Sequence, residues 1–334
     1  MFVQSLKFVE SHHGNKDKVS IVGQESKPDT WRLCKMNLAI RGIAHNLGIK
    51  NESTFTEDLH KDKKVDFIMA NPPFNLKNWR AEDELTKDPR WSGFTIPPVS
   101  NANYAWMLHM LSKLDVNHGI AGYLMANGAL NADGDEQAIR EELLRRDRIE
   151  AIIVLPRDMF YTVDLSATLW IMNMNKKAGE VNGRKVRDRT GEVLFIDLRS
   201  WNKNIDTIVF DKGKKKKKIV LVKTQIERVK EIYNGWQSPD RSLYEDIPEL
   251  CHSTKIWNDD LTEEERKNGV VTIESKNFSL APSKYIEFID HDMDIDYETE
   301  MNRIQEEMKK VLGDEKISQA MLEDAFRGIG YGID

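Results

Sequence analysis

An apolar segment that ends in two consecutive prolines constrains the fold of this chain more than any other feature. Residues 65–70 have the pattern of a short buried strand, and Asn71-Pro72-Pro73-Phe74 follows directly. Proline lacks the backbone N–H that a sheet ladder or a helix interior needs, so the strand must stop and the chain must turn. In open α/β sheets, ligands bind at the carboxyl ends of the strands. We therefore expect Asn71 and Phe74 at a ligand-binding edge.

The segments around this strand alternate between strand and helix patterns. Short apolar runs predict strands at 19–22, 65–70, 119–125, 149–155 and 168–174, with a weaker one at 53–56. Helical periodicity predicts helices at 2–9, from 29 or 30 to Gly48, at 102–114 and at 136–146. This alternation is typical of a parallel sheet wound with helices, and we expect the sheet to end near residue 175.

The character of the chain changes after residue 175. A strand at 192–198, a helix at 224–233 and a highly charged helix at 296–326 are predicted there. We expect three parts: an α/β catalytic domain at 1–175, an α/β extension at 176–290 and a helical tail at 291–334. The tail carries apolar residues at helical spacing, which is typical of a packing or partner-binding helix.

Two segments leave a structural and a functional interpretation open. The long loop after Phe74 contains Trp79 and Trp91, which fit a binding loop and a packing role about equally well. The segment 212–218 contains six lysines. A solvated surface turn is the favoured interpretation of that run, and a phosphate-contacting loop is the alternative.

Charge and cysteine content exclude several classes of protein. The formal net charge of -6 argues against a free-standing, strongly basic nucleic-acid binder, so any contact with DNA must be local or shared with a partner. No apolar run is long enough to span a bilayer and the first ten residues do not form a signal peptide, so we expect a cytoplasmic protein without membrane contact. Cys34 and Cys251 are far apart and indicate neither a disulfide framework nor a metal site.

The Asn71-Pro72-Pro73-Phe74 segment has groups suited to an exocyclic amino group. The side-chain oxygen of Asn71 and the carbonyl oxygen of Pro72 form an acceptor pair for its two hydrogens, which favours a pyramidal nitrogen with a free lone pair. Phe74 offers a flat face on which a purine can stack, a contact worth roughly 1–3 kcal/mol. The alternative is an ordinary turn with a core phenylalanine. The combination of all four residues after an apolar strand favours the functional interpretation.

This tetrapeptide resembles the catalytic motif of DNA adenine-N6 methyltransferases. The surrounding sequence resembles the modification subunit (HsdM) of type I restriction-modification systems over roughly residues 1–200. The motifs that carry this resemblance are Gly23-Gln24-Glu25, Met36-Asn37-Leu38, Asp58 and Leu155-Pro156. The resemblance implies a Rossmann-like, S-adenosylmethionine-dependent methyltransferase sheet with an α-rich carboxyl-terminal extension. It also implies three partners: DNA, a specificity subunit and a restriction subunit.

The resemblance assigns roles to individual residues. Glu25 matches the acid that holds the ribose hydroxyls of S-adenosylmethionine, and Asp58 matches the acid that accepts from the cofactor's adenine amino group. Asn71, Pro72, Pro73 and Phe74 match the catalytic motif that holds a flipped adenine, with Asn71 also next to the cofactor. Flipping is required because the amino group of a paired base is out of reach of the methyl donor.

The chain departs from the family pattern at its start. The family's glycine-rich turn, of the Asp-Pro-x-x-Gly-Ser-Gly-Gly type, would precede Met1, so we expect a sheet without its first strand. This departure leaves open an inactive fragment that retains assembly surfaces. A second alternative comes from the tetrapeptide, which also occurs in methyltransferases that act on a protein glutamine amide. The aromatic loop after Phe74 and the flanking sequence, which resembles type I subunits, disfavour the glutamine alternative.

Overall fold

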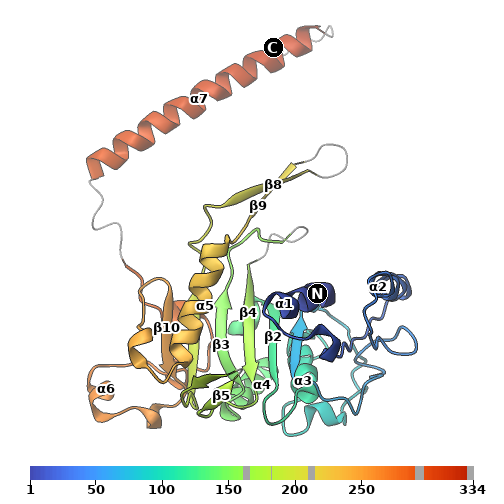
Figure 1. Cartoon of the computed structure of the whole chain (residues 1–334). Coiled ribbons are helices and arrows are strands. Elements are labelled where there is room, and N and C mark those ends of the chain that lie inside the picture. The colour runs from blue at the N-terminus through green and yellow to red at the C-terminus, as the bar shows by residue number, and fades with distance from the viewer. Residues whose placement is uncertain (161–165, 182, 210–214, 290–296, 329–334) are drawn as a thin grey trace. The chain divides into compact units, whose positions relative to one another are not determined.

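The computed structural model describes residues 1–160, 166–181, 183–209, 215–289 and 297–328 (Figure 1). The chain forms two compact units, Met1–Glu287 and Phe288–Asp334. The first unit contains the sheet, and the described part of the second is essentially the long helix α7 (Tyr297–Gly328). The boundary predicted between residues 175 and 176 falls inside the first unit.

The centre of the first unit is a six-stranded sheet in the order β1-β2-β4-β3-β7-β10. Its strands are β1 (Phe67–Ala70), β2 (Ile120–Ala126), β3 (Ile149–Val154), β4 (Ala167–Asn173), β7 (Glu192–Asp197) and β10 (Cys251–Lys255). Strands β1, β2, β3 and β7 run in one direction, while β4 and β10 run in the opposite direction. The carboxyl ends of the four parallel strands therefore share one side of the sheet, which we call the carboxyl edge.

The predicted α/β architecture is confirmed, with two corrections. The sheet is mixed, because β4 pairs antiparallel with both β2 and β3. The expected end of the sheet near residue 175 is wrong, because β7 and β10 extend it. A strand's own residues reveal its period, whereas its partner and direction depend on distant residues, so the local pattern could not give either.

Three helices cover the two faces of this sheet: α3 (Asn103–Lys113) and α4 (Asp135–Arg145) pack on one face, and α5 (Lys223–Gln237) packs on the other. The first unit also contains α1 (Phe2–Ser11), α2 (Pro28–Ile40) and the short α6 (Glu263–Lys267). Side chains of β3 alternate between the two cores: Ile152 packs on the side of α3 and α4, and Ile153 on the side of α5. This alternation follows from the period of two in a strand and produces the three layers seen in Figure 1.

Short elements complete the unit. Two separate hairpins are formed by β5 (Gly179–Val181) with β6 (Arg184–Val186) and by β8 (Ile205–Val209) with β9 (Lys215–Ile219). Single 3-10 turns are found at Lys16–Lys18, Pro89–Trp91, Asn127–Leu130, Arg241–Leu243, Asn258–Asp260, Glu274–Lys276 and Pro282–Lys284. None of the helices that the structure describes combines the length and the apolar character that a membrane crossing requires.

A buried carboxylate joins α5 to the sheet. Glu150 on β3 is fully buried and accepts hydrogen bonds from Arg189 Nε at 2.9 Å, Asn173 Nδ2 at 2.7 Å, Tyr233 Oη at 3.0 Å and Gln237 Nε2 at 3.1 Å. A buried charge is tolerated only when it is paired and hydrogen-bonded, and both conditions are met here. The network ties β3, β4 and the segment before β7 to one face of α5.

Several predictions for the first 70 residues are wrong. The predicted strand at 19–22 is reduced to a single parallel bridge between Val22 and Asn46, and residues 54–56 form a turn. Helix α2 ends at Ile40 instead of Gly48, because Gly42 takes a φ of 64° that reverses the chain. Leu33, Met36 and Ile40 on its predicted apolar face are exposed.

The prediction that the strand before Asn71 is buried is also wrong for one of its faces. Phe67 is 68% exposed and Met69 is 61% exposed. β1 is the terminal strand of the sheet, so within the described chain only β2 pairs with it. A strand at an edge keeps one row of backbone groups unpaired, and here it also keeps two apolar side chains exposed.

Candidate active site

Asn71 follows β1 directly and therefore lies at the carboxyl edge. Its side chain is exposed, and it has no hydrogen-bond partner within the part of the chain that the structure describes. Phe74 is half-buried and Pro73 is exposed. The strand end thus presents an amide and an aromatic ring to solvent on the same turn.

The turn after Phe74 is fixed by a pair of asparagines. Asn75 has a φ of 53°, and its backbone N–H donates to Oδ1 of Asn103 at 2.9 Å. The side-chain nitrogen of Asn103 donates in return to Oδ1 of Asn75 at 2.9 Å. Asn103 is only 1% exposed at the start of α3. Sequence reasoning missed this residue, since its only local signal is an asparagine at a predicted helix start.

The tryptophans of the long loop have a packing role. Trp79 and Trp91 are buried, and each indole N–H donates to a backbone carbonyl, of Pro98 at 2.8 Å and of Leu85 at 3.0 Å. The Trp79 ring also packs against Phe55 with centroids 4.5 Å apart. Of the two open interpretations of the loop, the structure supports the structural one for these two residues.

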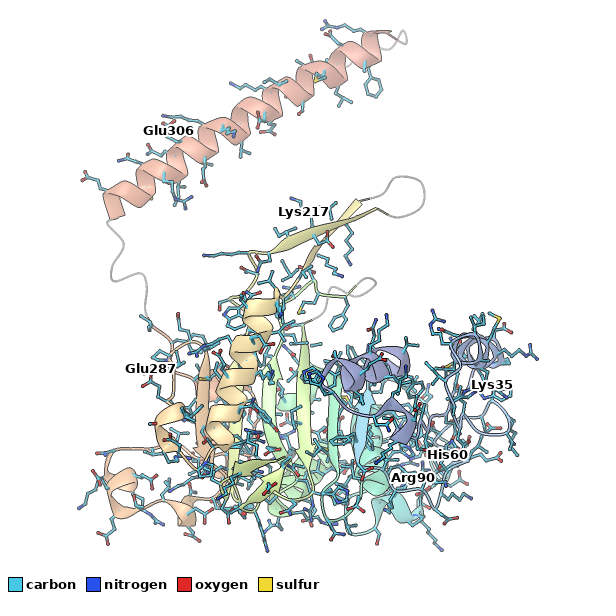
Figure 2. The ribbon with its side chains drawn as sticks, in the orientation of Figure 1. Lys35, His60, Arg90, Lys217, Glu287 and Glu306 are labelled. Carbon is cyan, nitrogen blue, oxygen red and sulfur yellow. The ribbon has the colours of Figure 1, made fainter. Side chains whose placement is uncertain are left out.

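Gln24 ties the segment containing Glu25 to residues 52–59. Its Oε1 accepts from the N–H of Leu59 at 3.0 Å, and its Nε2 donates to the carbonyls of Glu52 at 3.1 Å and Glu57 at 2.7 Å. His60, labelled in Figure 2, adds a bond from its Nε2 to the Gly23 carbonyl at 2.9 Å. The two segments that carry the predicted cofactor acids are therefore held side by side.

The Glu25 carboxylate is half-buried and partly engaged. Its Oε1 accepts from the backbone N–H of Lys27 at 2.8 Å, just before α2 begins. Its Oε2 has no partner among the described residues. The backbone N–H of Glu52 donates to the Glu25 carbonyl at 3.0 Å, so Glu52 is the acid that lies beside Glu25. Sequence reasoning did not single out Glu52.

Asp58 is engaged inside the protein. Its Oδ2 pairs with Lys113 Nζ at 2.5 Å, and its Oδ1 accepts from the N–H of His60 at 2.9 Å. Burial by itself would raise the pKa of Asp58, but the hydrogen bonds from Lys113 and His60 outweigh burial and lower the pKa. The carboxylate is therefore ionised and anchors the loop to the end of α3. Its role toward a cofactor stays a prediction.

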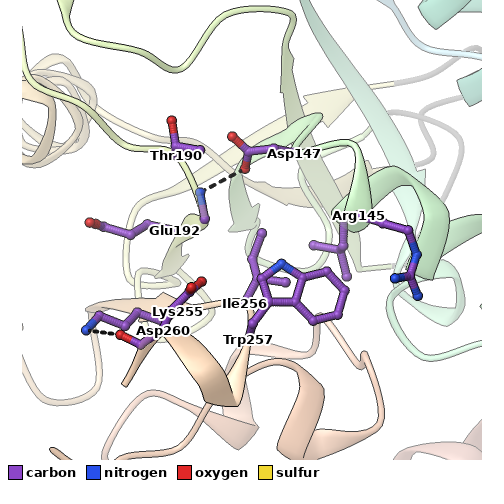
Figure 3. Close-up of a pocket in the computed structure, with 10 residues that line it drawn as sticks. Arg145, Asp147, Thr190, Glu192, Lys255, Ile256, Trp257 and Asp260 are labelled. Carbon is purple, nitrogen blue, oxygen red and sulfur yellow. Dashed lines mark hydrogen bonds between the residues drawn. The ribbon is translucent and has the colours of Figure 1, made fainter. Parts of the chain in front are cut away.

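A cavity of about 340 Å³ lies at the opposite end of the sheet (Figure 3). It is bordered by residues at the amino ends of β3 and β7, including Asp147 and Glu192. Asp147 pairs with Lys176 at 2.5 Å and accepts from Gly191 N–H at 3.2 Å, and Glu192 pairs with Arg187 at 2.7 Å. Because buried or half-buried cations already pair with these two acids, we interpret the cavity as part of the packing between elements. Asn71 lies at the other edge of the sheet.

Known proteins resemble this chain over most of its length. A family model described as N-6 DNA Methylase matches residues 1–294. The type I restriction enzyme HindI methylase subunit of Haemophilus influenzae is 35% identical over 332 residues, covering 99% of this chain and 66% of that protein. The MjaIX methylase subunit of Methanocaldococcus jannaschii is 30% identical, covering 99% of this chain and 54% of that protein.

A solved structure shares the fold. The methyltransferase subunit of a type I restriction-modification system from Streptococcus thermophilus superposes with a TM-score of 0.58 at 26% identity, covering 80% of this chain and 48% of that one. The chain thus spans about half to two thirds of the length of these relatives.

Proposed function

The chain belongs to the N-6 DNA methylase family, and from that premise we propose that it is the methyl-transfer part of a type I modification subunit, acting on the amino group of adenine in DNA. One observation carries the proposal. Asn71 is exposed at the carboxyl edge, directly after β1, with a side-chain amide that no described residue engages. A buried or hydrogen-bonded asparagine would be a structural residue, whereas this one is available to a ligand.

The proposed chemistry uses hydrogen-bond acceptors and no metal. The side-chain oxygen of Asn71 and the carbonyl oxygen of Pro72 accept from the two hydrogens of the adenine amino group. Accepting both favours a pyramidal nitrogen whose lone pair is no longer delocalised into the ring, which makes the nitrogen nucleophilic. Phe74 stacks on the flipped base, and the prolines hold the Pro72 carbonyl in place because their φ angles are fixed.

The family is of the S-adenosylmethionine-dependent class, and S-adenosylmethionine supplies the methyl group when bound. The donor set of this chain fits part of that molecule. Glu25 has one carboxylate oxygen without a described partner, which suits a ribose hydroxyl donor, and Glu52 lies beside it. Asp58 fits less well, since Lys113 and His60 engage both of its oxygens.

The helix α7 supports a role in assembly. Over its 32 residues, Met301, Ile304, Met308 and Leu312 recur at helical spacing and are substantially exposed. An exposed apolar stripe on a long helix is typical of a helix that packs against a partner. We assign this partner to the specificity subunit, which would read the DNA sequence, with a restriction subunit in the same cytoplasmic assembly.

The test is methyl transfer from labelled S-adenosylmethionine to DNA by this chain assembled with its specificity partner. Asn71→Ala should lower the rate roughly 100-fold or more, the scale of losing one hydrogen bond made in the transition state. Asn268→Ala, an exposed asparagine after α6, is the matched control and should leave the rate unchanged.

Three outcomes would contradict the proposal. Equal rates for wild type and Asn71→Ala would remove the role given to Asn71. Label on protein in place of DNA would favour the glutamine-amide alternative. Absence of any transfer by the wild-type assembly would favour an inactive chain that retains assembly surfaces.

A further inference from the structure

One strand of the β8–β9 hairpin consists largely of lysines. Residues 212–218 contain six lysines, and the run from Lys215 onward forms β9, paired antiparallel with β8 so that Lys217 lies opposite Thr207. Lys217 is exposed on the hairpin in Figure 2. The surface turn predicted for 212–218 is wrong for 215–218, because these residues pair as a strand.

The base of the hairpin is attached to the carboxyl edge. The N–H of Ile219 donates to the carbonyl of Asp158, four residues beyond β3, at 3.0 Å. The N–H of Val220 donates to the carbonyl of Asn204, beyond β7, at 3.0 Å, and Asn204 Nδ2 donates to Gln225 Oε1 on α5 at 3.1 Å. The hairpin therefore rises from the same side of the sheet on which Asn71 lies.

The lysine row is difficult to explain as structure alone. Lysine is depleted from strands, and like charges on one strand face repel each other. Side chains alternate along a strand, so Lys217 shares its face with Thr207 and Ile205, which carry no charge to offset it. The other face differs, because Asp206 lies opposite Lys218 there and both Lys216 and Lys218 are engaged. Lysine at a sheet edge also discourages unwanted strand pairing. A run of lysines in a chain of net charge -6 indicates a polyanionic ligand.

The spacing within the sheet fits a DNA duplex. From β1 to β3 is three strand positions and from β1 to β7 is four. At about 4.8 Å per strand, the hairpin base lies roughly 14–19 Å along the sheet from the strand that ends at Asn71. That span corresponds to about four to six base pairs, or near half a helical turn. One duplex can therefore reach both Asn71 and the hairpin.

We propose that the β8–β9 hairpin is an arm that binds the phosphate backbone of duplex DNA beside the target base, with Lys217 as a direct contact. This inference rests on the proposed DNA-methyltransferase function and adds the surface that holds the duplex. Phosphate contacts position a protein on DNA without reading sequence, which complements sequence reading by a separate subunit.

The test measures how binding to duplex DNA without a recognition site depends on salt, using the full chain and fluorescence anisotropy. The affinity of a DNA-binding protein falls with salt by a log–log slope of about 0.9 per neutralised phosphate. Lys217→Gln should reduce that slope by about 0.9, the loss of one phosphate contact. The control is Lys185→Gln, which removes the same charge from an exposed lysine near the other edge of the sheet.

The control should leave the slope unchanged. An unchanged slope in the hairpin variant, or an equal loss in the control, would overturn the proposal. Polyglutamate that competes as well as DNA at equal charge would also overturn it, in favour of an acidic protein partner. Lys217→Thr, which places a strand-forming residue at the same position, should lower the slope by the same amount.

These binding measurements are independent of methyl transfer. Loss of slope without any transfer activity would leave the hairpin proposal standing while the proposed function fails. Methyl transfer with an unchanged salt slope would support the proposed function and overturn the hairpin proposal.

Discussion

Replacing Asn103 with alanine tests whether the turn that carries Asn71 is held from α3. Asn103 is buried and makes two hydrogen bonds of 2.9 Å to Asn75, one from each side of its amide. Alanine removes both bonds and leaves the Asn75 turn, with its φ of 53°, without its anchor. Asn75 is itself exposed, so water can satisfy its freed groups.

The size of the effect follows from these two bonds. A neutral hydrogen bond contributes about 0.5–1.5 kcal/mol net, so the loss is about 1–3 kcal/mol. Because about 1.4 kcal/mol corresponds to a factor of ten, the ordered turn can be depopulated by at most about 5- to 150-fold. We expect methyl transfer to fall within that range and urea unfolding to show a destabilisation of about 1–3 kcal/mol.

Asn101→Ala is the matched control for this experiment. Asn101 Oδ1 accepts from the backbone N–H of Asn103 at 3.0 Å, so its loss weakens the same helix start without touching Asn75. The control loses one hydrogen bond, so it should lower stability by about 1 kcal/mol and leave methyl transfer nearly unchanged. Equal transfer rates for Asn103→Ala and wild type, or an equal loss in Asn101→Ala, would refute the claim that the asparagine pair positions Asn71.

Two further predictions concern stability. Glu150→Ala should destabilise the fold by about 3–5 kcal/mol because it leaves Arg189 buried without its carboxylate, and a cost below about 1 kcal/mol in urea unfolding would contradict this. The double change Glu150→Leu with Arg189→Met should recover only part of that loss, because Asn173, Tyr233 and Gln237 then keep buried donors without an acceptor. Burial, together with the positive charge of Arg90, lowers the pKa of His109 to about 4 from an ordinary 6.5. The unfolded chain therefore binds a proton between those pH values that the folded chain does not, so stability should fall as pH drops from 6.5 toward 4, by on the order of 2–3 kcal/mol, and His109→Gln should flatten that slope.

Much of the site could be predicted from the sequence because its signals are local. Two prolines after an apolar strand require a turn, and periodicity placed α3, α4 and β3 within one or two residues of where they lie. The resemblance to type I modification subunits, drawn from Asn71-Pro72-Pro73-Phe74 and a few flanking motifs, is confirmed by the family match.

Tertiary structure decided what depends on residues far apart in the sequence. The antiparallel direction of β4, the extension of the sheet by β7 and β10 and the exposed faces of α2 and β1 follow from pairing and covering between distant segments. The same holds at the site, where Asn103 is hydrogen-bonded to Asn75, 28 residues away in the sequence, and Lys113 forms an ion pair with Asp58, 55 residues away. A sequence pattern indicates which residues are buried or hydrogen-bonded. The partner of each residue is determined only when the chain folds and brings distant segments together.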